Sequence, residues 1–256
     1  GLENARKEAE ILLSKSLGIP FKLLLTSLHD PVPSSKEEYF RELILKRKEQ
    51  YPLQYLTGTQ NFMSLDFEVN EKVLIPRWDT ERLVELALKL MNNQEEPWVA
   101  DVGTGSGAIA VCLAKYHDKS RVFALDISPD ALEVAKRNAA RHGVKERITF
   151  LSGDLLKPII NAPEFQDVKF NLVVSNPPYI PAEEINSLPS DVQKEPHLAL
   201  NGGEDGLACY RELLPQAKRV LKPGGNILLE IGYNQAADVG EICRANGFQD
   251  ICVIKD

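Results

Sequence analysis

The sequence lacks the residue types and runs that mark several large classes of protein. Its 256 residues include four cysteines, and these are scattered without Cys-x-x-Cys spacing, so neither a zinc site nor a disulfide framework is predicted. No apolar stretch approaches the roughly 20 residues that a membrane-spanning helix needs, and the first residues do not resemble a signal peptide. We therefore expect a cytosolic protein with reduced thiols, no metal site and no membrane contact.

The chain also lacks an excess of positive charge. Its formal net charge is -7, with an isoelectric point near 5.3. This balance argues against a protein whose affinity rests on many phosphate contacts, so we expect no stable binding of nucleic acid. The length allows either one large α/β domain or a domain with an appendage, and the patterns below favour two units.

The first part of the chain has the periodicity of helices. Apolar residues recur with helical spacing over 5–17, and Ser34 to Glu37 predict the capped start of a second helix that runs toward Lys48. Alternating apolar residues over 60–69 then predict a hairpin, and Asp79-Thr80 predict the start of a helix that ends at Met91. We expect a small all-α domain over 1–52, a β-hairpin linker over 53–76 and a larger domain over 77–256.

The larger domain alternates strand and helix, which predicts an α/β fold with a mostly parallel sheet. Expected strands lie at 98–102, 121–125, 148–151, 170–174, 226–231 and 248–254. Expected helices lie at 108–115, 130–141 and between Gly206 and Leu221, where Pro223-Gly224-Gly225 is a stop signal.

A glycine-rich turn follows the first of these strands. It runs Asp101-Val102-Gly103-Thr104-Gly105-Ser106-Gly107, and it is compatible with a dinucleotide site, a nucleoside-methionine site or a tight strand-to-helix connection. The third glycine comes too early for the G-x-G-x-x-G dinucleotide pattern. Asp126 ends the second strand, where it could accept both ribose hydroxyls or merely cap a helix, and Asp154 follows the third strand, within reach of an adenine amine.

Asn176-Pro177-Pro178-Tyr179 directly follows the apolar run that starts at Phe170. An Asn side-chain oxygen and the carbonyl of the next residue can together accept both hydrogens of a planar NH2 group. The prolines stiffen the backbone, and Tyr179 provides an aromatic wall. The motif therefore predicts an acceptor site for an amide or amino group, although an isolated Asn-Pro pair more often marks only a turn.

With these motifs the chain resembles the release factor glutamine methyltransferases, the PrmC/HemK family of class I S-adenosylmethionine-dependent methyltransferases. The segments that carry the resemblance are Ile75 to Glu81, Asp101 to Gly107, Asp126, Asn176 to Ile180, Glu195-Pro196, Leu198 to Leu200 and Gly202 to Gly206. The resemblance covers nearly the whole chain and implies a Rossmann-like domain preceded by a helical domain that grips the protein substrate.

The resemblance further implies methyl transfer to the glutamine amide nitrogen of the Gly-Gly-Gln loop of peptide-chain release factors, with S-adenosylhomocysteine as product. Asn176, Pro177 and Tyr179 are expected to be catalytic and, with Pro178, to bind the substrate amide. The residues expected to bind the cofactor are Asp101, Gly103, Thr104, Gly105, Ser106, Gly107, Asp126, Asp154, Leu155 and Asn176. A monomer is expected.

The chain departs from the family pattern at two places, and other functions stay open. Trp78 stands where the family often has proline, and similar proteins add an antiparallel strand after the one expected at 248–254, so we expect the natural chain to continue. An adenine amino methyltransferase acting on DNA or RNA would use the same acceptor motif. A glutamine methyltransferase of a ribosomal protein and a catalytically silent cofactor-binding module are further alternatives.

Overall fold

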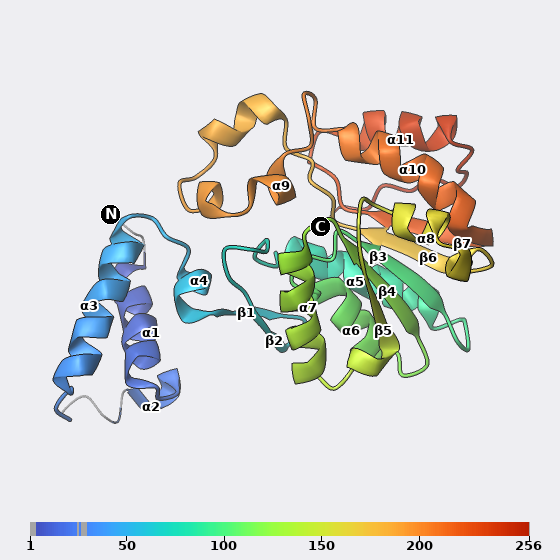
Figure 1. The fold of residues 1–256 in the computed structure, drawn as a ribbon. Helices are drawn as coiled ribbons and strands as arrows, with labels where there is room; N and C mark the ends of the chain where they lie inside the picture. The colour runs from blue at the N-terminus through green and yellow to red at the C-terminus, as the bar shows by residue number, and fades with distance from the viewer. Residues whose placement is uncertain (1–3, 25, 27–29, 256) are drawn as a thin grey trace.

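The N-terminal helices form a bundle of their own in the computed structural model, which describes residues 4–24, 26 and 30–255. The helices are α1 (Ala5–Leu17), α2 (Phe21–Leu24), α3 (Ser34–Lys48) and α4 (Leu53–Thr57). Leu12, Leu43 and Leu56 are buried together, so α4 packs on α1 and α3. Pro33, rather than a serine side chain, occupies the N-cap of α3. Figure 1 shows this bundle at the left, set apart from the sheet.

The hairpin between the two units packs on the larger one. It consists of β1 (Thr59–Phe62) and β2 (Leu65–Glu68), paired antiparallel as predicted. Phe62 and Phe67 are buried in the core of the larger unit, and Arg137 pairs with Glu68 at 2.8 Å. The hairpin is therefore a fixed part of the α/β unit, whereas α4, at the start of the expected linker, packs on the N-terminal helices.

The larger unit is built on a five-stranded parallel sheet with the order β5-β4-β3-β6-β7. Its strands are β3 (Trp98–Val102), β4 (Arg121–Asp126), β5 (Ile148–Ser152), β6 (Phe170–Ser175) and β7 (Leu221–Leu229). The chain builds outward from β3 to β5 and then crosses back to β6, so the strand order reverses between β3 and β6. Ligands of such sheets bind outside the carboxyl ends of the strands at this reversal.

Helices cover both faces of the sheet (Figure 1). The helices of the larger unit are α5 (Asp79–Met91), α6 (Ala108–Tyr116), α7 (Pro129–Arg141), α8 (Lys157–Asn161), α9 (His197–Leu200), α10 (Ala208–Val220) and α11 (Ala236–Ala245), of which α9 lies in the long loop after β6. The short 3₁₀ helices are η1 (Lys145–Arg147), η2 (Pro163–Phe165), η3 (Ala182–Ser187) and η4 (Val192–Lys194). Among the described residues, no helix is both long enough and apolar enough to cross a membrane.

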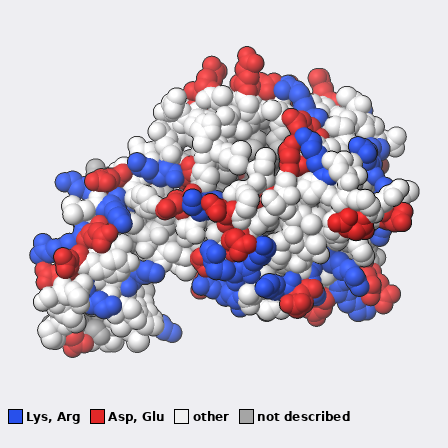
Figure 2. Space-filling model, viewed as in Figure 1, with Lys and Arg blue, Asp and Glu red and all other residues white. Residues whose placement is uncertain are grey.

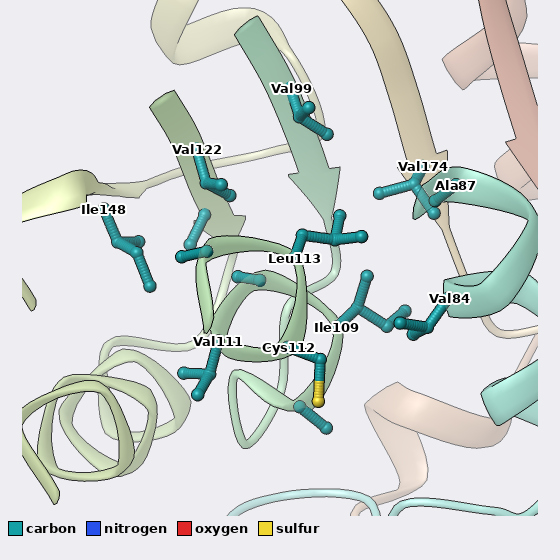
Figure 3. Packing of buried hydrophobic residues seen from close by; sticks show 14 of the residues in the cluster. Val84, Ala87, Val99, Ile109, Val111, Cys112, Leu113, Val122, Ile148 and Val174 are labelled. Carbon is teal, nitrogen blue, oxygen red and sulfur yellow. The ribbon is translucent and has the colours of Figure 1, made fainter. Parts of the chain in front are cut away.

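Alternate residues of the strands supply two hydrophobic cores. Val99 faces the core built with α5 and α6, whereas its neighbour Ala100 faces the core built with α8 and α10. Figure 3 shows Ile109 of α6 close to Val84 of α5 within the first core. Burial on both faces explains why these strands are continuous apolar runs, and it confirms the predicted α/β class.

Two sequence expectations differ from the structure near the end of the chain. Pro223-Gly224-Gly225 lies inside β7, because Leu221 already pairs with Phe170 before the strand bulges at these residues and resumes at Asn226. The strand expected at 248–254 is absent: within the described residues, no backbone hydrogen bond joins 249–255 to β7. Apolar residues there predicted a strand, but a strand requires a hydrogen-bonded partner.

Candidate active site

The glycine-rich turn joins β3 to α6 at the carboxyl edge of the sheet. The amides of Gly103 and Thr104 both donate to the Leu125 carbonyl at 2.9 Å, which ties the turn to the end of β4. Gly107 has φ +80° at the N-cap of α6, and a Cβ there would lie 2.9 Å from the Ala135 Cβ. Only glycine suits this position, because the backbone is left-handed and α7 packs directly against it.

Asp126 lies beside this turn, at the end of β4. Its Oδ2 accepts from the Gly105 amide at 2.8 Å and its Oδ1 accepts from the Ser128 amide at 2.9 Å. Burial raises the pKa of this carboxyl, while these amide donors oppose the rise. The Ser128 hydroxyl, rather than Asp126, caps α7 by accepting from Ala131. The aspartate therefore holds the glycine turn in place.

Asp101 is completely buried beneath the turn. Its Oδ2 accepts from the Thr104 hydroxyl at 2.7 Å and from the Ala110 amide at 3.1 Å, whereas its Oδ1 has no hydrogen-bond partner among the described residues. Burial raises the pKa of Asp101 to about 7, against the opposing effect of these two donors. A buried carboxylate oxygen without a donor is costly in a folded protein.

Asp154 and Leu155 follow β5 on the same edge. The Asp154 carboxylate pairs with Lys157, and its side chain is 41 % exposed. Leu155 has φ +50° and packs at the margin of the second core. Both residues thus lie at the carboxyl end of β5, and the Asp154 carboxylate is already engaged by a lysine.

Asn176 follows β6, directly beside the glycine turn. Ser175 is in register with Val102, and the Asn176 carbonyl oxygen lies 4.0 Å from where a Cβ on Gly103 would be. The Asn176 side-chain nitrogen donates to the Thr80 hydroxyl at 3.1 Å. Within the described part of the chain, no donor reaches the Asn176 Oδ1 or the Pro177 carbonyl. These two oxygens are the acceptors that the motif predicts.

The segment after the prolines is held by a glycine-rich loop. The Ile180 amide donates to the Leu200 carbonyl at 3.1 Å, and the Gly202 amide donates to the Ile180 carbonyl at 2.8 Å. Gln235 adds a clamp, since its Nε2 donates to the carbonyls of Tyr179 at 2.9 Å and Gly206 at 3.3 Å. These bonds explain why the loop at 198–206 accompanies the Asn-Pro-Pro-Tyr motif.

Arg77 and Glu195 connect the segment before α5 to this loop region. The Glu195 side chain is 2 % exposed, and it accepts from Arg77 Nη2 at 2.5 Å and from the Ile75 amide at 2.9 Å. Glu195 therefore joins the segment before α5 to the loop that precedes α9. Trp78, next to Arg77, is 77 % exposed, so the ring is available to a ligand or partner.

No role for Glu230 or Gln235 was predicted from the sequence, and Thr80 served only to place the start of α5 and, within Ile75 to Glu81, to carry the family resemblance. Thr80 donates its hydroxyl hydrogen to Glu230 Oε2 at 2.7 Å while it accepts from Asn176. Glu230 directly follows β7, so the rule that located Asp126, a polar residue at the carboxyl end of a parallel strand, could have located it too. Gln235 carries no comparable signal.

Comparisons with known proteins show which family has this arrangement. The release factor glutamine methyltransferase of Moorella thermoacetica is 47 % identical over 96 % of this chain and 85 % of that protein. The release factor glutamine methyltransferase of Geobacter sulfurreducens is 42 % identical over 100 % of this chain and 87 % of the length of that protein. This chain belongs to the release factor glutamine methyltransferase family. Family models agree: one described as a methyltransferase domain matches residues 95–253, and one described as the PrmC N-terminal domain matches residues 1–58.

Solved structures share the fold of the larger unit of this family member. A methyltransferase of Agrobacterium tumefaciens has a TM-score of 0.53 at 15 % identity, covering 73 % of this chain and 57 % of that one. A ribosomal protein L11 methylase of Lactobacillus delbrueckii has a TM-score of 0.52 at 26 % identity, covering 73 % and 79 %. The predicted Rossmann-like methyltransferase fold is therefore confirmed.

Proposed function

We propose that the protein transfers a methyl group from S-adenosylmethionine to the side-chain amide nitrogen of a glutamine in the Gly-Gly-Gln loop of a peptide-chain release factor. The observation that carries the proposal is the pair of acceptors, Asn176 Oδ1 and the Pro177 carbonyl, that follows β6 beside the glycine turn. The membership of the family supports the choice of substrate. Such a substrate implies a cytosolic location.

The residues at the sheet edge suit S-adenosylmethionine. The turn over Asp101 to Gly107 lets the backbone approach a ligand closely, and the unpartnered Asp101 Oδ1 suits a cation such as the methionine ammonium. Asp126 is positioned to accept from ribose hydroxyls, with Asp154 and Leu155 at the adenine side. When bound, the cofactor supplies an electrophilic methyl group with the sulfur as leaving group.

The acceptor residues address the weak nucleophilicity of an amide nitrogen, whose lone pair is delocalised into the carbonyl. Asn176 and Pro177 would each accept one N–H, which turns the remaining electron density toward the methyl carbon. Accepting both hydrogens also stabilises the positive charge that develops on nitrogen. Tyr179 would pack on the amide plane and exclude water. As the new N–C bond forms, the nitrogen becomes acidic and loses one proton to solvent.

The same acceptors suit the exocyclic amine of adenine, so nucleic acid is the competing substrate. The net charge of -7 disfavours it. On the face seen in Figure 2, Lys and Arg are largely interspersed with Asp and Glu and form no continuous basic strip. A polyanionic substrate would require such a strip.

The test is the destination of a radiolabelled methyl group. The protein is incubated with labelled S-adenosylmethionine and, separately, with a release factor, the same factor with its loop glutamine changed to alanine, and adenine-containing DNA or RNA. Label on the intact factor alone is expected. Label on nucleic acid, on the altered factor or on a ribosomal protein would contradict the proposed substrate.

Asn176→Ala tests the proposed role of the acceptor within that assay. Loss of one positioned acceptor is expected to lower kcat by about a hundredfold or more. Cofactor affinity, measured by calorimetry, is expected to fall far less than kcat, because Asn176 is only one of the residues expected to bind the cofactor. An unchanged kcat would exclude the acceptor role of Asn176.

A further inference from the structure

Three side chains form a hydrogen-bonded chain behind the proposed acceptor site. Glu230 Oε2 accepts from the Thr80 hydroxyl at 2.7 Å, and the Thr80 oxygen accepts from Asn176 Nδ2 at 3.1 Å. Thr80 is 4 % exposed and lies in the first turn of α5, whereas Glu230 follows β7. These hydrogen bonds therefore link the start of α5 and the end of β7 to Asn176, the residue after β6.

The donors and acceptors in this series of hydrogen bonds have a fixed order, because the Thr80 hydroxyl has a single hydrogen to donate. A carboxylate can only accept, so Glu230 takes the hydrogen of Thr80. The Thr80 oxygen then has only lone pairs to offer, and Asn176 must present its NH2 group rather than its carbonyl oxygen. An asparagine amide that is free to rotate could equally present either end to a substrate. Because Thr80 gives its one hydrogen to Glu230, this hydrogen bond decides which end of the Asn176 amide is turned away from Thr80.

We propose that Thr80 and Glu230 are positioning residues that fix the orientation of the Asn176 amide, so that Oδ1 rather than Nδ2 faces the substrate. This inference rests on the proposed function for its consequence in turnover, but the orientation itself is a property of the free protein. A flipped amide would direct an N–H toward the substrate NH2 group and repel it. The structure also ties the Glu230 backbone down, since the Tyr210 hydroxyl donates to its carbonyl at 2.8 Å.

Substitutions at Thr80 separate positioning from packing. Thr80→Val keeps the shape but removes the acceptor, and kcat is expected to fall by about tenfold or more, the equivalent of one hydrogen bond to a catalytic group. Thr80→Ser keeps the hydroxyl and is expected to restore most of kcat. The cofactor Kd is expected to stay within about twofold in both variants, because the hydrogen bonds of the Thr80 side chain go to Glu230 and Asn176 rather than to the glycine turn.

Glu230→Gln tests the direction of the chain. The glutamine amide can donate to Thr80, which frees the Thr80 hydrogen to bond Asn176 Oδ1 and turn the amide around. We expect kcat to fall as in Thr80→Val, with little change in Tm. Ser120→Ala is the matched control, since the buried Ser120 hydroxyl bonds, among the residues that the structure describes, only the Leu113 and His117 carbonyls, and its loss should leave kcat unchanged.

A second readout does not depend on turnover. The Asn176 side-chain amide signals, assigned by NMR from their absence in Asn176→Ala, should show slow hydrogen exchange in the wild type and Thr80→Ser and faster exchange in Thr80→Val. Equal exchange in wild type and Thr80→Val, or a normal kcat in both Thr80→Val and Glu230→Gln, would overturn the inference. Slow exchange lost in Thr80→Val without any methylation of a release factor would uphold the positioning and reject the proposed substrate.

Discussion

The two halves of the candidate site are held in different ways. The proposed cofactor side, Asp101 to Gly107 with Asp126, is fixed by hydrogen bonds between residues 3, 9 and 21 positions apart. The proposed acceptor side, Asn176 to Tyr179, is fixed by hydrogen bonds between residues 96 and 56 positions apart. Thr80, which supports Asn176, is itself bonded to Glu230, 150 positions away. One half is a local motif, and the other is assembled by the complete fold. A substitution in one half should therefore impair the function of that half, cofactor binding or turnover, and leave the other largely intact.

The largest expected effect on kcat comes from Gly206→Ala, which disturbs the acceptor side alone. Gly206 has φ +76°, and a Cβ there would collide with the Tyr179 carbonyl and lie 2.6 Å from Gln235 Nε2. The Asn-Pro-Pro-Tyr segment must then shift, and a displacement of about 1 Å can cost a hundredfold in rate. We expect kcat to fall by about that factor while the cofactor Kd, measured by calorimetry, stays nearly unchanged.

Gly107→Ala is the counterpart on the cofactor side. Its Cβ would lie 2.9 Å from the Ala135 Cβ at φ +80°, so the start of α6 must move. Cofactor affinity should fall here, whereas in Gly206→Ala it should persist. Gly224→Ala controls for the strain of a left-handed residue, since Gly224 has φ +75° with nothing within 4 Å of the added Cβ. Equal losses of cofactor affinity in Gly206→Ala and Gly107→Ala would contradict the separation of the halves.

The same contrast explains what could be predicted from the sequence. Strand alternation and the glycine turn are local, so β3, its turn and Asp126 were predicted at or near their observed positions. The motif Asn176 to Tyr179 was recognised, but its supports Glu230 and Gln235 were not, because they come from distant segments that only the folded sheet brings together. The prediction of a strand at 248–254 was wrong for a related reason, because alternating apolar residues do not reveal whether a partner strand is present.

An intermediate effect is expected from Glu195→Gln, which weakens the contact between the segment before α5 and the loop near the acceptor side. Arg77 loses its carboxylate partner, and a buried hydrogen bond to a charged group contributes about 1.5–3 kcal/mol. Part of Arg77 is exposed to solvent, so we expect the free energy of unfolding, measured with urea, to fall by an amount near the lower end of that range. KM for the release factor should rise, with the cofactor Kd retained.

An exposed ion pair is the control for that loss. Glu95 pairs with Lys119 at 3.1 Å, and both side chains are largely exposed. Glu95→Gln should change the unfolding free energy by less than about 1 kcal/mol, because water screens such pairs. If Glu195→Gln were as mild as Glu95→Gln, the loop would be held mainly by its backbone bonds to Ile180.

The smallest effect concerns pH and the cofactor side alone. Burial raises the pKa of Asp101 to about 7, so this carboxyl is partly protonated at neutral pH in the free protein. A bound ammonium group favours the carboxylate. Affinity for S-adenosylmethionine should therefore increase as pH rises from 6 to 7.5, by up to about tenfold, through this one group. Asp101→Asn should bind more weakly and lack this increase in calorimetry.

Stability of the free protein should change in the opposite direction. Because the folded pKa of Asp101, about 7, lies above its ordinary value of 3.8, the folded state holds the proton more tightly than the unfolded state. The stability this provides is present below about pH 4 and is lost as pH rises through 7. Asp101→Asn cannot titrate, so its Tm relative to wild type should rise over that interval. Parallel Tm profiles would mean that Asp101 stays ionised, and they would leave the cofactor side without its pH dependence, while the acceptor side, held by Thr80 and Glu230, would be unaffected.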